Sequence, residues 1–223
     1  MIRSRILGTG SHLPPRVVTN DDLSKMFNTT DEWIVQRTGV RQRRYVDPGW
    51  GPSEIGAEAA KQALDMAGLK PRDLDFMIVA TQTPPAEFPG TACFIQKILD
   101  NPGIGALDVR DQCTGFLYGL SIADAYVRLG QYQRVLVVGT EVHSTGLEFA
   151  DNGRHVTVLF GDGAGAVIVG PSEKPEQGIQ SIHLHADGRH AESLWTEAPS
   201  SKCNPRISHE MLEQGRHYPR MDG

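Results

Sequence analysis

Short apolar runs of strand length recur along the chain and alternate with helical patterns. Most of these runs are apolar at consecutive rather than alternate positions, which is typical of strands covered on both faces. Alternating strands and helices of this kind predict an α/β architecture with a largely parallel sheet. In chain order, the runs read RILGTG, LDFMIVATQT, IGALDV, RVLVVGTE and VTVLFGDGAGAVIVG.

Two segments between the strands carry the start and stop signals of helices. In PSEIGAEAAKQALDMAGLKP, Ser53 is a suitable N-cap and Gly68 a C-terminal stop. The residues at every fourth position of this segment are Ile55, Ala59, Ala63 and Ala67. Because this face is small, we expect the helix to pack close to its neighbour. In NTTDEWIVQRTG, Thr29 and Glu32 have the spacing of a capping box, and Gly39 ends a helix of about two turns.

Two glycine-rich stretches raise the question of a phosphate-binding loop. In VTVLFGDGAGAVIVG, two apolar arms flank GDGAG, whose three glycines permit a tight reversal, and we predict a hairpin. The stretch lacks the lysine and following Ser or Thr of a Walker loop. GTGSHL has Leu13 where a dinucleotide fingerprint requires its third glycine. Neither stretch therefore supports a nucleotide cofactor.

A polar segment from Pro171 to Gly178, PSEKPEQG, follows the strand-rich part of the chain. Its two prolines and one glycine are typical of a linker. After it come the alternating run IQSIHLHADG, a further strand candidate, and then polar, irregular sequence. We therefore expect three parts: residues 1–170, a linker at 171–178, and residues 179–223 as the beginning of a second structural unit.

Composition and charge narrow the functional classes. A chain of 223 residues can bury one large core or two modest ones, and its 39% hydrophobic residues with 24 glycines are ordinary for a globular protein. A net charge of -5 gives no electrostatic footprint for nucleic acid. No run reaches the ~18 apolar residues of a membrane span, and the N-terminus carries no apolar export signal. We therefore expect a soluble cytoplasmic protein.

Cys113 stands at a chemically distinctive point of the chain. It follows the strand GALDV by a short turn and precedes TGFLYGLSIADAYVRLG, a helical pattern with small residues four apart. A thiol in the first turn of a helix faces the positive end of the helix dipole and unpaired backbone N–H groups, which favour the thiolate. The small residues would let the helix cross a crowded interior and leave the thiol at the bottom of a pocket. A buried, inert cysteine remains the alternative.

The three cysteines are Cys93, Cys113 and Cys203, an odd count without a CxxC pair. This pattern favours neither a disulfide framework nor a zinc site, and it fits a reducing cytoplasm.

Four motifs of this chain resemble motifs of β-ketoacyl-acyl carrier protein synthase III and occur in the same order as in that family. They are GTGSHLPPRVVTNDDL, TTDEWIVQRTGVRQRRYV, DVRDQCTGFLYGL and VLFGDGAGAVIVG. The resemblance implies a thiolase-like layered αβαβα fold, with its first half complete here and its second half only begun. The family's catalytic histidine and asparagine lie in HQAN-like and GN.S-like motifs, and neither motif occurs in this sequence. We therefore expect the chain to continue, and this segment alone not to complete a condensation.

Site residues follow from the resemblance, position by position. Cys113 matches the nucleophile that takes an acyl group from coenzyme A as a thioester, with its own backbone N–H as one oxyanion donor. Trp33 and Arg37 match positions that hold the adenine of coenzyme A. Thr38 matches a polar partner beside them, and Arg154 an arginine that contacts the same ligand. Arginines suit this task because they pair with phosphates and stack on flat rings.

The resemblance also implies the surroundings of the nucleophile. Phe88 matches a loop residue that enters the acyl pocket of a partner subunit, which implies a homodimer. Phe116 is a candidate for a residue that determines the width of the acyl pocket. Coenzyme A enters as the thioester substrate, and no cofactor or metal is implied. His183, His185 and His190 in HLHADGRH could suggest zinc, but they align with an ordinary strand and turn of the family.

The implied function is an acyltransferase that initiates fatty-acid or polyketide chains. It would condense an acyl-CoA with malonyl-acyl carrier protein by a decarboxylative Claisen reaction through a cysteine thioester. One alternative is a specialised thiolase-fold acyltransferase, or a long-chain acyl condensing enzyme, of secondary metabolism. Another is a non-catalytic scaffold subunit of a synthase, which would have an unreactive Cys113 and bind no coenzyme A.

The sequence also contains one dense basic cluster, formed by Arg37, Arg41, Arg43 and Arg44. Charge runs of this kind are usually a solvated face. The resemblance adds a second interpretation, a contact with phosphate or with the acidic carrier protein.

Overall fold

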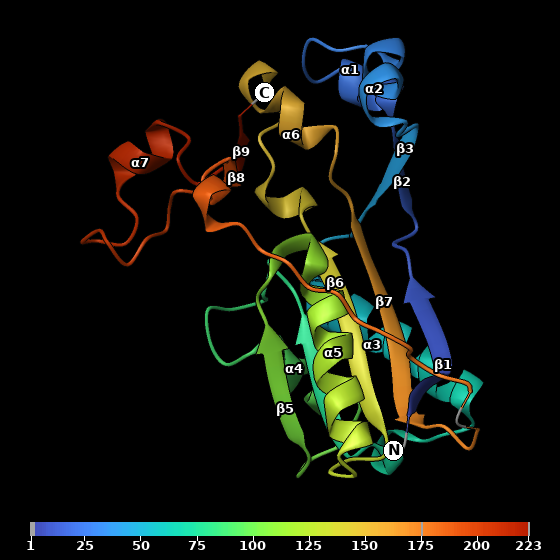
Figure 1. The fold of residues 1–223 in the computed structure, drawn as a ribbon. Coiled ribbons are helices and arrows are strands. Elements are labelled where there is room, and N and C mark those ends of the chain that lie inside the picture. Colours follow the sequence, from blue (N-terminus) through green and yellow to red (C-terminus); the bar gives the residue numbers. More distant parts are fainter. Residues whose placement is uncertain (1–2, 175, 223) are drawn as a thin grey trace. The chain divides into compact units, whose positions relative to one another are not determined.

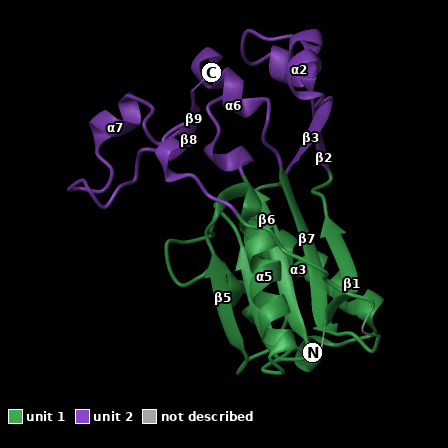
Figure 2. Cartoon of the chain, in the orientation of Figure 1, with its two compact units in different colours: residues 1–15, 46–142, 162–184 green, residues 16–45, 143–161, 185–223 purple. Residues whose placement is uncertain are grey.

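The computed structural model describes residues 3–174 and 176–222 (Figure 1). They form two compact units, each assembled from three stretches of chain (Figure 2). Unit 1 comprises residues 1–15, 46–142 and 162–184, and unit 2 comprises residues 16–45, 143–161 and 185–223. The expected division into 1–170, 171–178 and 179–223 stays a prediction. Among the described residues, none of the helices is long and apolar enough to cross a membrane.

Unit 1 is built on a five-stranded sheet in the order β1-β7-β6-β4-β5. Its strands are β1 (Ser4–His12), β4 (Phe76–Ala80), β5 (Gly105–Val109), β6 (Val135–Val142) and β7 (Asp162–Pro171). β4 pairs in parallel with both β5 and β6, whereas β7 runs antiparallel to β6 and β1. The α/β class is confirmed, but the sheet is mixed, and the prediction of a largely parallel sheet holds only for β6-β4-β5.

Helices cover both faces of this sheet, as the consecutive apolar positions predict. Residues of β4 alternate between two cores: Met77 and Val79 pack with α3 (Pro52–Ala67), whereas Phe76 and Ile78 pack with α5 (Gly115–Arg128). α4 (Thr91–Ile98) lies beside α3. Figure 1 shows α5 in front of the sheet and α3 behind it.

The small face of α3 brings the helix very close to β1. A Cβ atom on Gly10 would lie 2.1 Å from the Ala59 carbonyl oxygen, and one on Gly8 would lie 2.3 Å from that of Ala63. The predicted close packing is therefore confirmed. Gly68 ends the helix with a left-handed φ of 67°, as predicted, but the helix begins at Pro52, two residues earlier than an N-cap at Ser53 would give, so that Gly51 rather than Ser53 is the N-cap.

The hairpin predicted at GDGAG is wrong. Asp162 to Gly165 form the first residues of β7, where Asp162 pairs with Val142 of β6 and Ala164 pairs with His12 of β1. The preceding apolar arm, residues 156–160, is not a strand: its first two residues end α6 (Arg154–Thr157), and a turn follows. Pairing with the two neighbouring strands, β1 and β6, therefore incorporates these residues into an interior strand of the sheet.

Unit 2 has a two-stranded antiparallel sheet, formed by β2 (Arg16–Thr19) and β3 (Gln42–Tyr45). Between them lie α1 (Asn20–Ser24) and α2 (Asp31–Thr38). The buried core of this unit contains Val18, Leu23, Phe27, Ile34, Tyr45 and Val158. The N-cap of α2 is Thr30 rather than the predicted Thr29, and its hydroxyl accepts from the Trp33 backbone N–H at 3.1 Å. Gly39 ends α2 with a φ of 72°, as predicted.

The last residues contain little regular structure. The run IQSIHLHADG, predicted to be a strand, has no strand pairing in the described part of the chain. Beyond it, β8 (Leu194–Trp195) pairs with β9 (Arg220–Met221), and α7 (His209–Glu213) lies between them in sequence. Alternation of polarity alone is not sufficient for a strand, because a strand also needs a partner for its backbone groups.

Candidate active site

Cys113 lies in a short 3₁₀ turn, Gln112–Thr114, which connects the carboxyl end of β5 to the first residue of α5. This is the position that the sequence predicts. The side chain, however, is exposed in the described chain, so the predicted burial at the bottom of a pocket is wrong there. The crowded part of α5 begins after the thiol: a Cβ atom on Gly115 would lie 3.2 Å from the Ala80 Cβ atom, and one on Gly119 would lie 3.0 Å from a Val137 methyl group.

The turn before Cys113 has an unusual backbone. Gln112 has a φ of 36°, in the left-handed region that a residue with a side chain rarely adopts. Thr114 supports the turn from the other side, since its hydroxyl lies 3.2 Å from the Asp111 carbonyl oxygen and 3.1 Å from an Asp111 carboxylate oxygen. The position of the thiol is therefore fixed by a local conformation that other contacts must stabilise.

Polar side chains at the carboxyl edge of the sheet connect neighbouring strands. Glu141, near the end of β6, accepts from the Gln82 backbone N–H at 2.8 Å and from the Thr83 hydroxyl at 2.7 Å. Thr83 Oγ1 in turn accepts from the Val142 backbone N–H at 2.8 Å. Sequence reasoning did not single out these residues. The available signal was a charged residue inside the apolar run RVLVVGTE and polar residues directly after LDFMIVA.

A second cluster, in unit 2, surrounds the indole ring of Trp33. The guanidinium carbon of Arg37 lies 4.3 Å from the centroid of this ring, and that of Arg154 lies 4.6 Å from it. The imidazole of His155 contacts the ring by an edge, at 5.6 Å between centroids. Arg154 is further held by a hydrogen bond to the Asn28 carbonyl oxygen at 3.0 Å. The structure thus brings together three residues that the sequence proposed for one ligand.

Thr38, the fourth proposed residue of that cluster, uses its hydroxyl within its own helix. The hydroxyl donates to the Ile34 carbonyl oxygen at 2.8 Å and accepts from the Val40 backbone N–H at 3.0 Å. Its immediate function is therefore to close the C-terminal turn of α2. A contact between Thr38 and a ligand stays a prediction.

The two phenylalanines predicted near the acyl chain differ in exposure. Phe88, in the loop between β4 and α4, is 81% exposed. Phe116, in the first turn of α5, is partly buried, and a Cβ atom on Gly139 would lie 3.1 Å from its ring. Phe88 is thus available for contact with another surface, whereas Phe116 packs against the sheet. The roles of both rings in an acyl pocket stay predictions.

Arg43 of the basic cluster is a structural residue, not part of a solvated face. Its buried guanidinium donates to Asn20 Oδ1 at 2.8 Å and to the Val158 carbonyl oxygen at 3.1 Å. Burial lowers the pKa of this guanidinium. Arg41, in contrast, is exposed, and Arg37 belongs to the Trp33 cluster. The four arginines therefore do not act as one surface.

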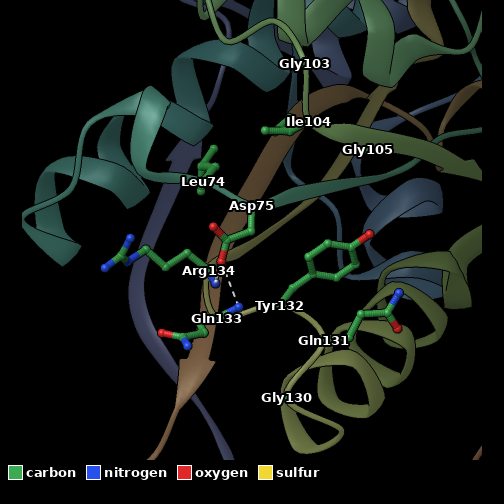
Figure 3. Close-up of a pocket in the computed structure, with 10 residues that line it drawn as sticks. All are labelled: Leu74, Asp75, Gly103, Ile104, Gly105, Gly130, Gln131, Tyr132, Gln133 and Arg134. Atoms are coloured by element: carbon green, nitrogen blue, oxygen red, sulfur yellow. Dashed lines mark hydrogen bonds between the residues drawn. The ribbon is translucent and has the colours of Figure 1, made fainter.

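An open hollow of about 570 Å³ lies at the amino ends of β4, β5 and β6 (Figure 3). In the close-up, the Asp75 carboxylate points to the backbone of the segment before β6, where it accepts from Gln133 and Arg134 N–H at 2.8 and 2.9 Å. Its lining comprises Leu74, Asp75, Gly103, Ile104, Gly105, Gly130, Gln131, Tyr132, Gln133 and Arg134. None of these is a predicted site residue, and Cys113 follows the other end of β5.

This chain is similar to proteins of known family. Residues 107–188 match the family model of 3-oxoacyl-[acyl-carrier-protein] synthase III. The β-ketoacyl-[acyl-carrier-protein] synthase III of Caldanaerobacter subterraneus subsp. tengcongensis is 46% identical over 222 residues, which are 100% of this chain and 66% of that protein. The chain thus spans just under two thirds of this curated relative.

Solved structures agree with this result. The 3-oxoacyl-[acyl-carrier-protein] synthase III of Aquifex aeolicus VF5 superposes with a TM-score of 0.86 at 40% identity, covering 99% of this chain and 65% of that one. A further 3-oxoacyl-(acyl-carrier-protein) synthase III, solved at 2.1 Å, gives a TM-score of 0.89 at 31% identity, covering 99% and 68% of the two chains.

Proposed function

Because this chain belongs to the β-ketoacyl-[acyl-carrier-protein] synthase III family, we propose that it carries the nucleophile of an acyltransferase that initiates fatty-acid or polyketide chains. The substrates are an acyl-CoA and malonyl-acyl carrier protein. The observation that supports the proposal most directly is the position of Cys113, between the carboxyl end of β5 and the start of α5, inside the matched residues 107–188.

In the first half-reaction, the Cys113 thiolate attacks the carbonyl carbon of the acyl-CoA. The carbon–sulfur bond to coenzyme A breaks, coenzyme A leaves as a thiolate that takes up a proton, and the acyl group remains on Cys113 as a thioester. Backbone N–H groups at the start of α5 stabilise the oxyanion of the tetrahedral intermediate, since the first turn of a helix leaves such donors without intrahelical partners.

In the second half-reaction, malonyl-acyl carrier protein loses carbon dioxide, and the resulting carbanion attacks the Cys113 thioester. This step expels the Cys113 thiolate and releases a 3-oxoacyl-acyl carrier protein. The carbanion needs hydrogen-bond donors that stabilise its enolate form. The synthase III family uses a histidine and an asparagine for this purpose, and this sequence has no motif that matches either of them. The first half-reaction is therefore the part that can be assigned to residues of this chain.

The Trp33 cluster binds the adenine end of the acyl-CoA. Its flat indole ring offers a stacking surface, and Arg37 and Arg154 supply positive charge for the phosphates. Both guanidinium groups lie close to the ring centroid, at 4.3 and 4.6 Å. An adenine that stacks on a ring face covered by one of them displaces that guanidinium, which then covers the other face of the base or pairs with a phosphate.

The enzyme acts as a cytoplasmic homodimer. The exposed Phe88 contacts the partner subunit at its acyl pocket, and Phe116 lines the pocket of its own subunit. These assignments rest on the family to which the chain belongs and on the exposure of Phe88.

Acyl transfer to Cys113 can be tested directly on the intact protein. After incubation with acetyl-CoA, peptide mapping by mass spectrometry should find one acyl group on the peptide that contains Cys113. Cys93 is a matched control, because it is also an exposed thiol at the start of a helix. Equal labelling of Cys93 and Cys113, or no acyl group on Cys113 from any acyl-CoA, would contradict the proposal and favour a scaffold role.

A further inference from the structure

We infer that Gln82 is a positioning residue for the nucleophile, which holds the turn before Cys113 in its unusual conformation. Glu141 in turn holds Gln82. The inference rests on the proposed function, because it deepens the role assigned to Cys113. It concerns a residue that touches neither the thiol nor the Trp33 cluster in any described contact, and that therefore acts only through the backbone of the turn.

The order of the strands brings the three participants together. β6, β4 and β5 are neighbours and run in parallel. Glu141 lies near the carboxyl end of β6, Gln82 follows the end of β4 at Ala80, and Gln112 follows the end of β5 at Val109. All three residues therefore lie at one edge of the sheet, although they are far apart in sequence. This edge is where α/β proteins commonly place their reactive groups.

The side chain of Gln82 accepts two hydrogen bonds from the turn. With its amide oriented so that the oxygen faces the donors, Oε1 lies 2.8 Å from the Gln112 backbone nitrogen and 3.3 Å from that of Asp111. Two successive N–H groups thus converge on one acceptor, directly before the nucleophile. The left-handed φ of 36° at Gln112 is unfavourable for a residue with a side chain, so the conformation needs these bonds.

Glu141 fixes the position from which Gln82 reaches the turn. Its carboxylate accepts from the Gln82 backbone N–H and from the Thr83 hydroxyl, at 2.8 and 2.7 Å. Because Thr83 Oγ1 also accepts from the Val142 backbone N–H, the loop after β4 is tied to β6 at two points. The backbone of Gln82 cannot shift without breaking these bonds, and its side chain is therefore directed to the turn after β5.

The chemistry of a glutamine suits this task. Its amide oxygen satisfies two N–H donors and adds no net charge beside a cysteine that must form a thiolate. A carboxylate at the same position would accept the same bonds, but its negative charge would oppose the thiolate. A side chain without an acceptor would leave the two N–H groups to water and release the turn.

Three substitutions at position 82 separate these effects. Gln82→Met keeps the approximate volume and replaces the amide oxygen with a thioether, a much weaker acceptor. Gln82→Glu keeps the acceptor and adds charge, and Gln82→Asn shortens the side chain if the other variants fold poorly. Gln96→Ala is the matched control, since the Gln96 amide also bonds a backbone group, the Ile104 carbonyl oxygen at 3.0 Å, but none in the turn before Cys113.

The main measurement is single-turnover acylation of Cys113 by acetyl-CoA in the intact protein, over a range of acetyl-CoA concentrations. Gln82→Met should lower the maximal rate about tenfold, since the competent turn becomes a minor conformation. The half-saturating concentration should not change, because no residue of the Trp33 cluster is altered. Gln96→Ala should leave both quantities unchanged. A purely structural role would not produce this split.

Hydrogen exchange provides a readout that does not depend on catalysis. In Gln82→Met, the amide protons of Asp111 and Gln112 should exchange faster, while the thermal unfolding midpoint stays close to that of the wild type. Gln82→Glu should keep the protection but acylate more slowly than the wild type. Wild-type rates and wild-type protection in Gln82→Met would overturn the inference.

Failure of the inference and failure of the proposed function are distinguishable. If wild-type Cys113 is never acylated, the proposed function fails, and the exchange of Asp111 and Gln112 still tests the role of Gln82. The rate of Cys113 alkylation by iodoacetamide adds a second test that needs no coenzyme A. If the wild type is acylated and Gln82→Met behaves identically in all three assays, only the inference fails.

Discussion

Arg37 lies one helical turn after Trp33 in α2, with its guanidinium carbon 4.3 Å from the centroid of the indole ring. The i, i+4 spacing places the two side chains on one face of the helix. Arg154 reaches the same ring from α6, at 4.6 Å. Two cations are therefore concentrated at one indole ring, an arrangement that suits the proposed binding of a flat base and phosphates.

The first prediction concerns the affinity for acyl-CoA. Arg37→Ala should raise the KM for acetyl-CoA about fivefold, because an interaction of about 1 kcal/mol between its guanidinium and the adenine or phosphates of the bound ligand is lost, while kcat stays unchanged. Trp33→Ala removes the ring that both arginines contact, and its effect should be larger. The measurement is steady-state kinetics of the intact enzyme, supported by calorimetric binding of coenzyme A.

Arg41→Ala is the control for this prediction. Arg41 is an exposed member of the same basic cluster, whereas the guanidinium groups over the Trp33 ring are those of Arg37 and Arg154. An equal rise of KM in Arg41→Ala would mean that only the net charge of the region matters, and would contradict the role of the ring.

The second prediction concerns the close approach of β1 and α3. Gly10→Ala should lower the free energy of unfolding by about 3 kcal/mol, because the new methyl group would lie 2.1 Å from the Ala59 carbonyl oxygen and 2.5 Å from the Ala63 nitrogen. Both are backbone atoms of a helix and cannot move away alone. Chemical denaturation of the purified protein measures the loss.

Gly165→Ala is the matched substitution in the same sheet. Gly165 lies in β7, and a Cβ atom there would have no atom within 4 Å. This variant should change the free energy of unfolding by no more than about 0.5 kcal/mol. Similar losses in the two variants would show that the crowding at Gly10 does not decide the result.

The third prediction concerns the pH dependence of stability through Asp22 in α1. The hydroxyl of Thr19 is the main cause that holds the pKa of the Asp22 carboxyl far below its usual range, followed by the Thr19 backbone N–H and Lys25. A carboxyl with a lowered pKa contributes stability that is complete above its unfolded-state pKa of about 4 and is lost as the pH falls below that value.

Asp22→Asn should therefore be less stable than the wild type at pH 7, and the difference should shrink below about pH 4. Denaturation at a series of pH values measures it. In the background of Thr19→Val, which lacks the hydroxyl, the pH-dependent part of the difference should be smaller. A difference that stays constant down to pH 2 would contradict the assignment.

Local sequence patterns predicted the elements whose ends depend on residues close in sequence. Examples are α3, which ends at Gly68, and α2, which ends at Gly39, because caps and periodicity act within a few residues. The position of Cys113 between a strand and a helix also followed from its neighbours in sequence. These predictions needed no knowledge of the rest of the chain.

Contacts between distant segments could not be predicted in this way. GDGAG allows a reversal, but β1 and β6 determine that it becomes the start of a central strand. Arg154 and Trp33 are brought together by the fold of unit 2, and only the resemblance to a known family connected them beforehand. The contact between Gln82 and Glu141 depends on the order of the strands in the sheet, which no spacing in the sequence predicts.

The core of unit 2 has a consequence for the synthesis of the protein. Val18 and Leu23 share that core with Val158, and the Arg43 side chain bonds the Val158 carbonyl across 115 residues of chain. At a translation rate of ~5–20 residues per second, the ribosome needs about ten seconds to make this intervening stretch. During that interval β2, β3, α1 and α2 are already synthesised, but the part of their apolar core that packs against Val158 is still uncovered. This nascent segment is thus the natural point at which a chaperone would protect the growing polypeptide.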